Sequence, residues 1–415
     1  MGNNYINVVK RIHNIVQNKF HEESELDDNK ALSIIANTTF EYFESYSDEM
    51  IASYSDIEEI VYKIFYKTRS RLNILKPLID DEKVSEIMVN NYNRIFFEKN
   101  GEIYSYNLHF DNEEEVEEVL QSIAGQVNRE INELNPILDA RLPDGSRVNG
   151  VFRNIAVTGP SITIRKFSKD VMSMEDLINN GTITVEGALL LKTFVKCGYN
   201  IFVSGATSSG KTTLINSLGD YIESNERVIV IEDSAELKLN NVPNLVQMEC
   251  RNSNSTGKGQ VTISDLIKNC LRMRPDRIII GEVRAGEVFD LLQAMNTGHS
   301  SMSTGHGNSI EGMLKRLETM YLMSATIDTD AIRRQIAEGI DVMVHIERRG
   351  NDRRIVEITE VVGYEDKTFI LNPIMKTDTN NNLRFTGSKI LNSNKIRRKG
   401  KASIDELHGI GVELG

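Results

Sequence analysis

Residues 200–222 read NIFVSGATSSGKTTLINSLGDYI, an apolar run, then a loop of small residues, then the start of a helical pattern. Within this stretch, GATSSGKT (205–212) matches the phosphate-binding pattern GxxxxGK[ST]. Glycine is needed there because the backbone curls until successive N–H groups point at one anion. A helix that begins at the loop adds positive potential at its N-terminus. The stretch therefore predicts a strand, a phosphate-binding loop and a helix of an α/β fold.

The side chains of this loop have distinct expected roles. Lys211 should reach the β- and γ-phosphates of a nucleoside triphosphate, and the Thr212 hydroxyl should ligate Mg²⁺. The loop has no Asp or Glu, whose charge would repel phosphate. We therefore expect ATP and Mg²⁺ as cofactors. The expected nucleotide-binding residues are Gly205, Ala206, Thr207, Ser208, Ser209, Gly210, Lys211, Thr212 and Thr213.

Carboxylates follow two other apolar runs, RIIIGE (277–282) and VIVIED (228–233). In doubly wound sheets, ligands bind at the carboxyl ends of the strands, so these groups should lie near the phosphate loop. Glu282 is the candidate for orienting the attacking water, and Glu232 could act on water bound to Mg²⁺. Glu236 fits a structural role and a catalytic role equally well.

Two histidines lie in a segment of small residues, TGHSSMSTGHGN (297–308). We expect His306 to be a sensor that hydrogen-bonds the terminal phosphate and reports its loss. His299 fits a sensor and a structural residue equally well. A zinc site is not expected, because the three cysteines are scattered, form no CxxC pair and do not adjoin these histidines. The same cysteine usage is typical of a reducing compartment.

The pattern around the loop predicts a larger domain. Over residues 185–375, strand and helix patterns alternate, and the strands are almost continuously apolar. This alternation is typical of a parallel sheet covered by helices. Residues 71–170 instead predict a smaller α+β domain, with strands that include 161–167. Residues 171–184 are expected to be a hinge linker between the two domains.

The two ends of the chain have a different character. Residues 1–70 predict a helical extension, in which apolar residues from 57 to 65 fall at helical spacing. This stripe is expected to pack on its own chain, and the alternative is a docking arm for a partner. Residues 376–415 are expected to form a basic, solvated tail. Its basic run KIRRKGK (395–401) could instead be attracted to an acidic membrane leaflet or partner.

The overall charge bears on possible partners. The chain has 415 residues, with 48 Lys and Arg against 60 Asp and Glu, a formal net charge of −12. Such an acidic protein is a poor bulk binder of nucleic acid. A nucleic-acid translocase is disfavoured further because the chain has no Trp and no basic–aromatic stripe. No apolar run approaches the ~18 residues of a membrane span, and a signal-peptide core is lacking, so a cytoplasmic protein is expected.

Three arginines in the expected α+β domain need a separate explanation. Arg141, Arg147 and Arg165 lie outside the phosphate-loop domain, in segments expected to form a hairpin and a strand. Arginine can neutralise the charge that develops on a transferred phosphoryl group. The residues alone favour a solvated surface role for all three.

The order of these segments resembles the type II/type IV secretion ATPase superfamily. The resemblance rests on GATSSGKTT (205–213), VIVIEDSAEL (228–237), RMRPDRIIIGEVRAGEVFDLLQAMNTGHSSMSTGHGN (272–308), DARLPDGSRVNG (139–150) and SITIRKF (161–167). It covers about 75–365 and is nearest to the tight-adherence (Flp) pilus assembly ATPase branch; conjugation-type ring ATPases are also similar. The chain lacks the tetracysteine zinc insertion of the general secretion branch.

The resemblance implies a homohexameric ring, with nucleotide between the N-terminal domain and a RecA-like C-terminal domain. It makes Arg141, Arg147 and Arg165 candidates for phosphate contact, which reverses the expectation from the residues alone. It implies ATP hydrolysis that powers Flp/Tad-like pilus assembly or protein secretion through an inner-membrane platform protein, at the cytoplasmic face of that membrane. A conjugation-type secretion ATPase is the alternative. A scaffold that binds nucleotide without hydrolysing it is the least favoured hypothesis.

Overall fold

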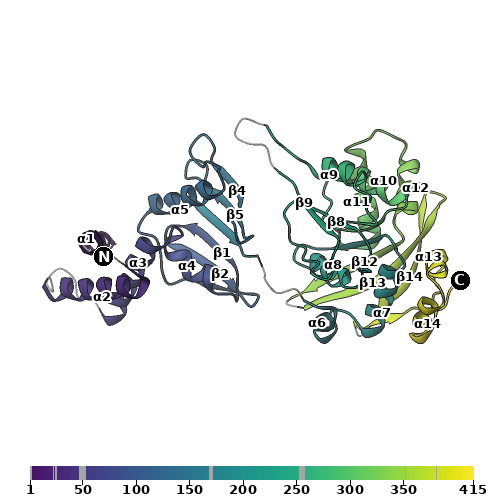
Figure 1. Cartoon of the computed structure of the whole chain (residues 1–415), viewed down its shortest axis with the longest axis horizontal. Coiled ribbons are helices and arrows are strands. Elements are labelled where there is room, and N and C mark those ends of the chain that lie inside the picture. The colour runs from purple at the N-terminus through teal and green to yellow at the C-terminus, as the bar shows by residue number, and fades with distance from the viewer. Residues whose placement is uncertain are drawn as a thin grey trace. The chain divides into compact units, whose positions relative to one another are not determined.

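The computed structural model describes residues 2–21, 23, 26–45, 53–167, 172–251, 258–350, 352–379 and 381–415. The chain divides into two compact units, Met1–Lys169 and Asp170–Gly415 (Figure 1). Each unit is built around its own sheet, with six strands in the first and nine in the second. No helix in these described ranges is both long and apolar enough to cross a membrane.

Three helices open the first unit and share a small core. They are α1 (Gly2–His21), α2 (Asp28–Ser45) and α3 (Tyr54–Arg69). The apolar stripe predicted from 57 to 65 supplies the α3 side of this core. The prediction that the stripe packs on its own chain is therefore confirmed.

The rest of the first unit is an antiparallel sheet with helix α5 (Glu113–Gln126) packed on one face. The strand order is β3-β2-β1-β6-β5-β4. The strands are β1 (Val84–Asn91), β2 (Arg94–Lys99), β3 (Glu102–Ser105), β4 (Ile137–Arg141), β5 (Arg147–Val151) and β6 (Ser161–Arg165), preceded by η1 (Asn73–Leu75) and α4 (Lys76–Asp80). The helix approaches closely at Gly150, where an added Cβ would lie 2.3 Å from Leu120 Cδ2.

The second unit is a mostly parallel sheet of strand order β15-β14-β13-β12-β7-β11-β10-β8-β9. Neighbouring strands from β12 to β9 in this order run parallel. The strands are β7 (Ile201–Gly205), β8 (Val228–Glu232), β9 (Leu245–Glu249), β10 (Arg277–Ile280), β11 (Ser300–His306), β12 (Val342–Arg349), β13 (Asp352–Glu365), β14 (Thr368–Thr377) and β15 (Leu383–Phe385).

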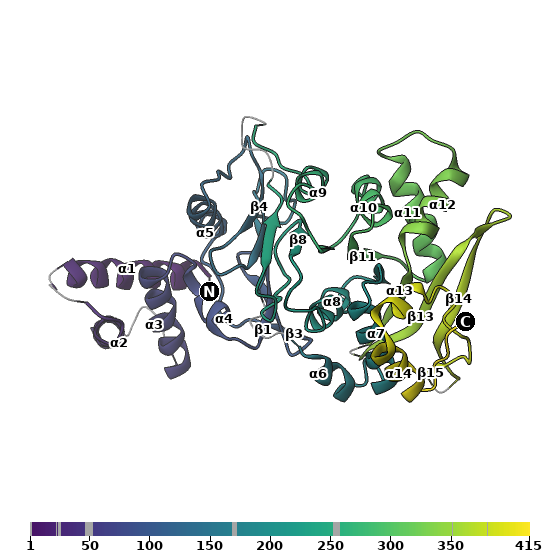
Figure 2. The same ribbon diagram turned by 45° about the vertical axis from the view of Figure 1, so that its right-hand side comes forward.

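Helices cover both faces of this sheet because successive strand residues point to opposite sides. In β8, Val228 and Val230 enter one core, whereas Ile229 and Ile231 enter the other. The first core is closed by α6 (Met174–Asn179), α7 (Val185–Lys196), α8 (Lys211–Gly219), α13 (Asn394–Lys399) and α14 (Lys401–Gly409). The second is closed by α9 (Ile263–Cys270), α10 (Glu287–Asn296), α11 (Ile310–Leu322) and α12 (Thr329–Gly339), which Figure 2 shows in green. The predicted α/β fold with a helix-covered parallel sheet is confirmed.

The expected hinge at 171–184 is wrong for its described part. Helix α6 occupies the middle of this segment, and Met174, Leu177 and Ile183 are buried in the same core as α7. These apolar side chains fix the segment to the second unit, so it is part of that domain and not a linker.

The expected solvated tail at 376–415 is also wrong. Strand β15 extends the sheet, and α13 and α14 pack on the core that holds α7 and α8. Three cations of the basic run have local partners: Lys395 Nζ lies 2.6 Å from Asp341 Oδ2, Lys399 Nζ lies 2.8 Å from Glu223 Oε1, and Arg397 donates to the Gly415 carbonyl. The run therefore belongs to a folded surface.

Candidate nucleotide-binding site

The predicted loop lies between β7 and α8. Gly210 precedes the helix with φ +98°, and Ser208 has φ +57°, so the backbone curls in the left-handed region at two points. Gly205 has no room for a side chain, because an added Cβ would lie 2.3 Å from the Ile346 carbonyl oxygen of β12. The loop is thus held closely against the neighbouring strand while Ala206, Thr207 and Ser208 remain exposed.

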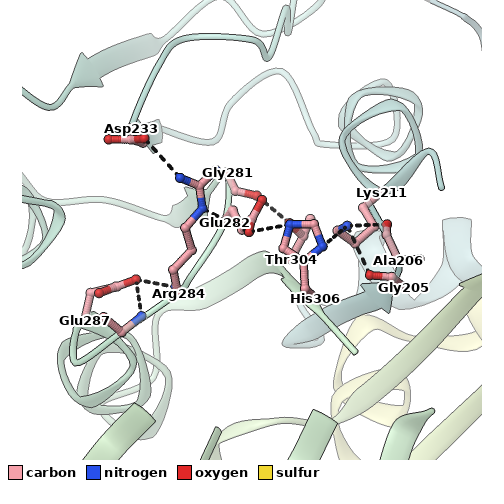
Figure 3. A network of polar contacts seen from close by, with 11 residues as sticks. Gly205, Ala206, Lys211, Asp233, Gly281, Glu282, Arg284, Glu287, Thr304 and His306 are labelled. Carbon is pink, nitrogen blue, oxygen red and sulfur yellow. Dashed lines mark hydrogen bonds and ion pairs between the residues drawn. The ribbon is translucent and has the colours of Figure 1, made fainter. Parts of the chain in front are cut away.

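Lys211 folds back over the loop. Its ammonium donates to the carbonyls of Ala206 at 2.8 Å and Gly205 at 3.2 Å, and lies 3.2 Å from His306 Nδ1 (Figure 3). The residue is only 6% exposed, and this burial lowers the pKa of the ammonium. Its hydrogen bonds join the loop to the end of β11.

His306 lies beside the loop because β11 runs parallel to β7, with His306 paired to Gly205. Burial and the nearby Lys211 ammonium lower its pKa, so the imidazole is neutral at neutral pH. An ammonium can only donate, which makes Nδ1 the acceptor from Lys211. Nε2 therefore carries the hydrogen and donates to Glu282 Oε1 at 2.9 Å.

Glu282 follows β10, at the same edge of the sheet. It also accepts from Arg284 Nε at 3.1 Å, and Arg284 Nη1 lies 3.3 Å from Asp233 Oδ2 after β8. Figure 3 shows the resulting chain of contacts from Lys211 through His306 and Glu282 to Arg284. The carboxyl ends of β8, β10 and β11 thus bring the predicted groups to the phosphate loop.

Glu232 lies at this edge too, but deeper. It is 3% exposed, and its Oε1 accepts from the backbone N–H groups of Glu236 at 2.9 Å and Leu237 at 3.1 Å. Its Oε2 has no hydrogen-bond partner within the described part of the chain. Burial raises the pKa of this carboxyl to about 7. Glu236 therefore contributes a backbone donor that holds Glu232.

The residues present suit a polyphosphate and an oxygen-binding cation. Ser209 Oγ is buried in the loop without a partner among the described residues, which leaves a hydroxyl ready to bind a ligand oxygen. Thr212, Asp233 and Glu282 offer the hard oxygen atoms that Mg²⁺ prefers. Where the structure describes the chain, no cluster of three His, Cys, Asp or Glu side chains could by itself hold a metal ion. Mg²⁺ commonly binds through phosphates and one or two protein groups, without a protein cage.

His299 does not reach this site. It begins the turn into β11, whereas His306 ends that strand. Its Nδ1 lies 3.2 Å from the Ala294 carbonyl and from Thr297 Oγ1, both at the end of α10. The sequence fitted both a sensor and a structural role for His299, and these contacts support the structural role.

The three arginines of the first unit form one row across its sheet. Arg141 pairs with Arg147 between β4 and β5, and Arg147 pairs with Arg165 between β5 and β6. Their strand neighbours Val148 and Ile164 are buried on the α5 side, so the row lies on the opposite face. The sequence did not reveal this alignment, because it depends on the register of two strand pairs.

Sequence reasoning missed two arginines at the loop edge. Arg284, two residues after Glu282, links that carboxylate to Asp233. Arg353 on β13 donates from Nε to the Ser208 carbonyl at 3.1 Å. The spacing of Arg284 from Glu282 was a usable signal, whereas Arg353 is distant in sequence and gave none.

Comparison with known proteins places the chain in a family. The sequence profile of type II/IV secretion system proteins matches residues 68–413. The chain belongs to the type II/IV secretion system protein family. The predicted family is therefore confirmed, and the match extends over the C-terminal helices that had been expected to lie outside it.

Relatives of this family member come from archaea and bacteria. An uncharacterized protein of Methanocaldococcus jannaschii is 42% identical over 274 residues, 64% of this chain and 36% of that protein. The conjugal transfer protein TrbB of Rhizobium radiobacter is 33% identical over 297 residues, 70% of this chain and 88% of that protein. The chain thus spans about a third of the archaeal protein's length and most of the length of TrbB.

Two solved structures share the fold of this family member. The ATPase DotB of Legionella pneumophila has a TM-score of 0.50 and 19% identity, covering 71% of this chain and 80% of DotB. The pilus retraction motor PilT with bound ADP has a TM-score of 0.50 and 19% identity, covering 75% of this chain and 84% of PilT. At this identity the likeness shows the fold alone, and it confirms the predicted RecA-like P-loop architecture.

Proposed function

We propose that this chain is a ring-forming ATPase that binds ATP with Mg²⁺ at Gly205–Thr213 and hydrolyses it to power pilus assembly or protein secretion. The observation that carries the proposal is the chain of contacts from Lys211 through His306 to Glu282, in a member of a secretion family. Phosphoryl transfer to water needs a grip on the phosphates and a group that orients the water. The loop and Glu282 have the chemistry for these two tasks.

Each group of the site is assigned a role by what it can donate or accept. Lys211 exchanges its loop carbonyls for phosphate oxygens. Glu282 then orients the attacking water, and neutral His306 relays the change at Lys211 to Glu282 through its two ring nitrogens. Mg²⁺ would neutralise phosphate charge, the Thr212 hydroxyl would hold the ion, and Glu232 would act on water at the site. Glu232 acts there as a proton acceptor only when it is ionised.

The arginine row supplies positive charge from the first unit. The three positions are register neighbours on one sheet face, and arginine at such positions can bind the oxygens of a polyphosphate. We assign Arg141, Arg147 and Arg165 to phosphate contact, either in their own subunit or in a neighbouring subunit of a homohexamer. Domain movement linked to hydrolysis would act on a platform protein at the cytoplasmic face of the inner membrane.

The catalytic assignment is tested by two substitutions. Lys211→Ala should abolish ATP hydrolysis and weaken nucleotide binding at least tenfold, because the phosphates lose their cation. Glu282→Gln should bind ATP with near-normal affinity but hydrolyse it at least a hundredfold more slowly. Steady-state phosphate release and fluorescent-nucleotide titration measure the two effects. Glu338→Gln, an exposed change on α12, is the matched control; full turnover in Glu282→Gln would remove Glu282 from the mechanism.

The cellular process is proposed to be Flp/Tad-like pilus assembly. The similarity to TrbB, whose name assigns it to conjugal transfer, makes conjugation-type secretion the second candidate. Replacing the gene by the Glu282→Gln allele in its host separates them. Loss of surface pili in electron micrographs supports pilus assembly, whereas intact pili with lost plasmid transfer supports the second candidate.

A further inference from the structure

The hairpin of β12 and β13 lies against the phosphate loop. Strand β12 pairs in parallel with β7, with Ile346 beside Gly205. On the returning strand, Arg353 donates from Nε to the carbonyl of Ser208, N···O 3.1 Å. An added Cβ at Gly210 would lie 3.3 Å from Arg353 Cδ. The aliphatic part of Arg353 therefore covers the loop, and its guanidinium group donates a hydrogen bond to the loop backbone.

Ser208, whose carbonyl accepts the hydrogen bond from Arg353, has an unusual backbone conformation. Ser208 has φ +57°, a left-handed conformation that residues with a side chain rarely adopt. Phosphate-binding loops depend on such a conformation, because it turns successive N–H groups toward one anion. A hydrogen bond that fixes the Ser208 carbonyl also fixes the peptide plane to the next N–H. Arg353 is thus placed to hold the loop in its anion-binding shape.

Arg353 differs from two other arginines of the hairpin, Arg349 and Arg354, while Arg348 donates to the Gly350 carbonyl within the hairpin turn. Arg349 lies 2.9 Å from Glu347, and Arg354 lies 3.5 Å from Asp352. No carboxylate of the described residues lies within ion-pair distance of Arg353, whose contact is the Ser208 carbonyl. Its side chain is exposed, and one carbonyl uses only part of a guanidinium with five N–H donors. Among the described residues, the positive charge beside the loop has no carboxylate partner.

We propose that Arg353 is a positioning residue for nucleotide binding, which fixes the Ser208 peptide and adds positive charge on the hairpin side of the loop. The ligand it serves is the polyphosphate of a nucleoside di- or triphosphate. The proposal rests on the proposed function, because it assigns a further residue to that same site. It also gives the β12–β13 hairpin a role in setting the affinity of the loop.

The test compares Arg353→Ala, Arg353→Lys and Arg354→Ala in the full chain. Arg354 neighbours Arg353 and is paired with Asp352, so it is a control with the same loss of hairpin charge. Fluorescent ADP and ATP titrations give dissociation constants, and ATP turnover gives kcat and KM. Arg353→Ala should raise the ADP dissociation constant and the KM for ATP about tenfold, with kcat within threefold of the parent. Arg353→Lys should recover part of that loss, and Arg354→Ala should bind like the parent.

Backbone hydrogen exchange tests the positioning role without nucleotide. Residues 206–211 should exchange faster in Arg353→Ala than in the parent, at an unchanged melting temperature. Unchanged affinity in Arg353→Ala, or an equal loss in Arg354→Ala, overturns the proposal. Failure of the parent chain itself to bind ADP or ATP would remove the proposed function, and this proposal with it.

Discussion

Glu232 is a carboxylate in a place where ionisation is costly. It is almost fully buried, one oxygen accepts two backbone hydrogen bonds, and the other has no partner among the described residues. Burial outweighs the two hydrogen bonds and raises the pKa to about 7 from an ordinary value of 4.5. The folded protein therefore keeps a proton on Glu232 at pH values where the unfolded chain has lost it.

This difference predicts how stability depends on pH. Since the folded-state pKa is raised, Glu232 does not lower the free energy of unfolding below about pH 4.5. Between pH 4.5 and 7 it lowers this free energy progressively, and above pH 7 the full loss is reached. The full effect is on the order of 3 kcal/mol. The melting temperature of Glu232→Gln minus that of the parent should therefore be several degrees larger at pH 8 than at pH 5. Differential scanning calorimetry without nucleotide measures both.

A conservative change nearby is the control for this prediction. Glu236→Gln alters the side chain but keeps the backbone N–H that binds Glu232. The Glu236 charge is a lesser cause of the raised Glu232 pKa than burial, so the variant should keep most of the pH dependence of the parent. A pH-independent difference between Glu232→Gln and the parent would mean that Glu232 is already ionised in the folded state at pH 5.

Single residues were predictable where their chemistry is local. Lys211, Glu282 and His306 each end or follow an apolar strand, and parallel strands bring such ends together. The contacts from Lys211 through His306 to Glu282 confirm that they meet. Arg353 could not be predicted, because its partner Ser208 is distant in sequence and only the sheet order places β13 near the loop.

At the scale of elements, β7 and β12 leave no space at the start of the loop. The Ile346 carbonyl and Ser209 Oγ would lie 2.3 and 2.6 Å from a Cβ at Gly205. Gly205→Ala must therefore displace either β12, which carries Ile346, or the loop, which carries Ser209. We expect at least a tenfold loss of ADP affinity and a lower melting temperature. Gly409→Ala, which meets nothing within 4 Å at the end of α14, should change neither.

The C-terminal helices contribute to stability as well as to the surface. Ile390, Ile396, Leu407 and Val412 are buried in the core that holds α7. At about 1.5–3 kcal/mol for each buried side chain, their loss would remove most of the stability of a typical domain. Deleting residues 390–415 should therefore give an aggregated or unfolded second unit by circular dichroism and gel filtration. A soluble, folded product would contradict this.

Removing one exposed positive charge tests whether this segment stabilises the protein through its buried apolar residues and not through its basic residues. Arg398 is exposed on α13, and Arg398→Gln should leave the melting temperature within a degree or two of the parent. The sequence misled here because the four fully buried apolar residues are spread over a segment rich in Lys, Arg and Asn. Tertiary packing, which periodicity alone does not reveal, decides the fold of this segment and of α6.

At the scale of the whole molecule, the division of the chain follows the type of sheet. Residues up to 169 form an antiparallel sheet with helices, and residues from 170 form the parallel sheet that carries the loop. The sequence distinguished these two patterns because buried parallel strands are almost continuously apolar. Groups that we propose to bind phosphate lie in both units, as a loop in one and an arginine row in the other.

The arginine row also has a practical consequence for handling the protein. Neighbouring guanidinium groups on one sheet face should favour any small multivalent oxyanion in the buffer. Sulfate or phosphate salts should therefore raise the melting temperature of the protein more than sodium chloride of equal ionic strength. Replacing Arg147, the central member of the row, by Gln should abolish the difference between the salts.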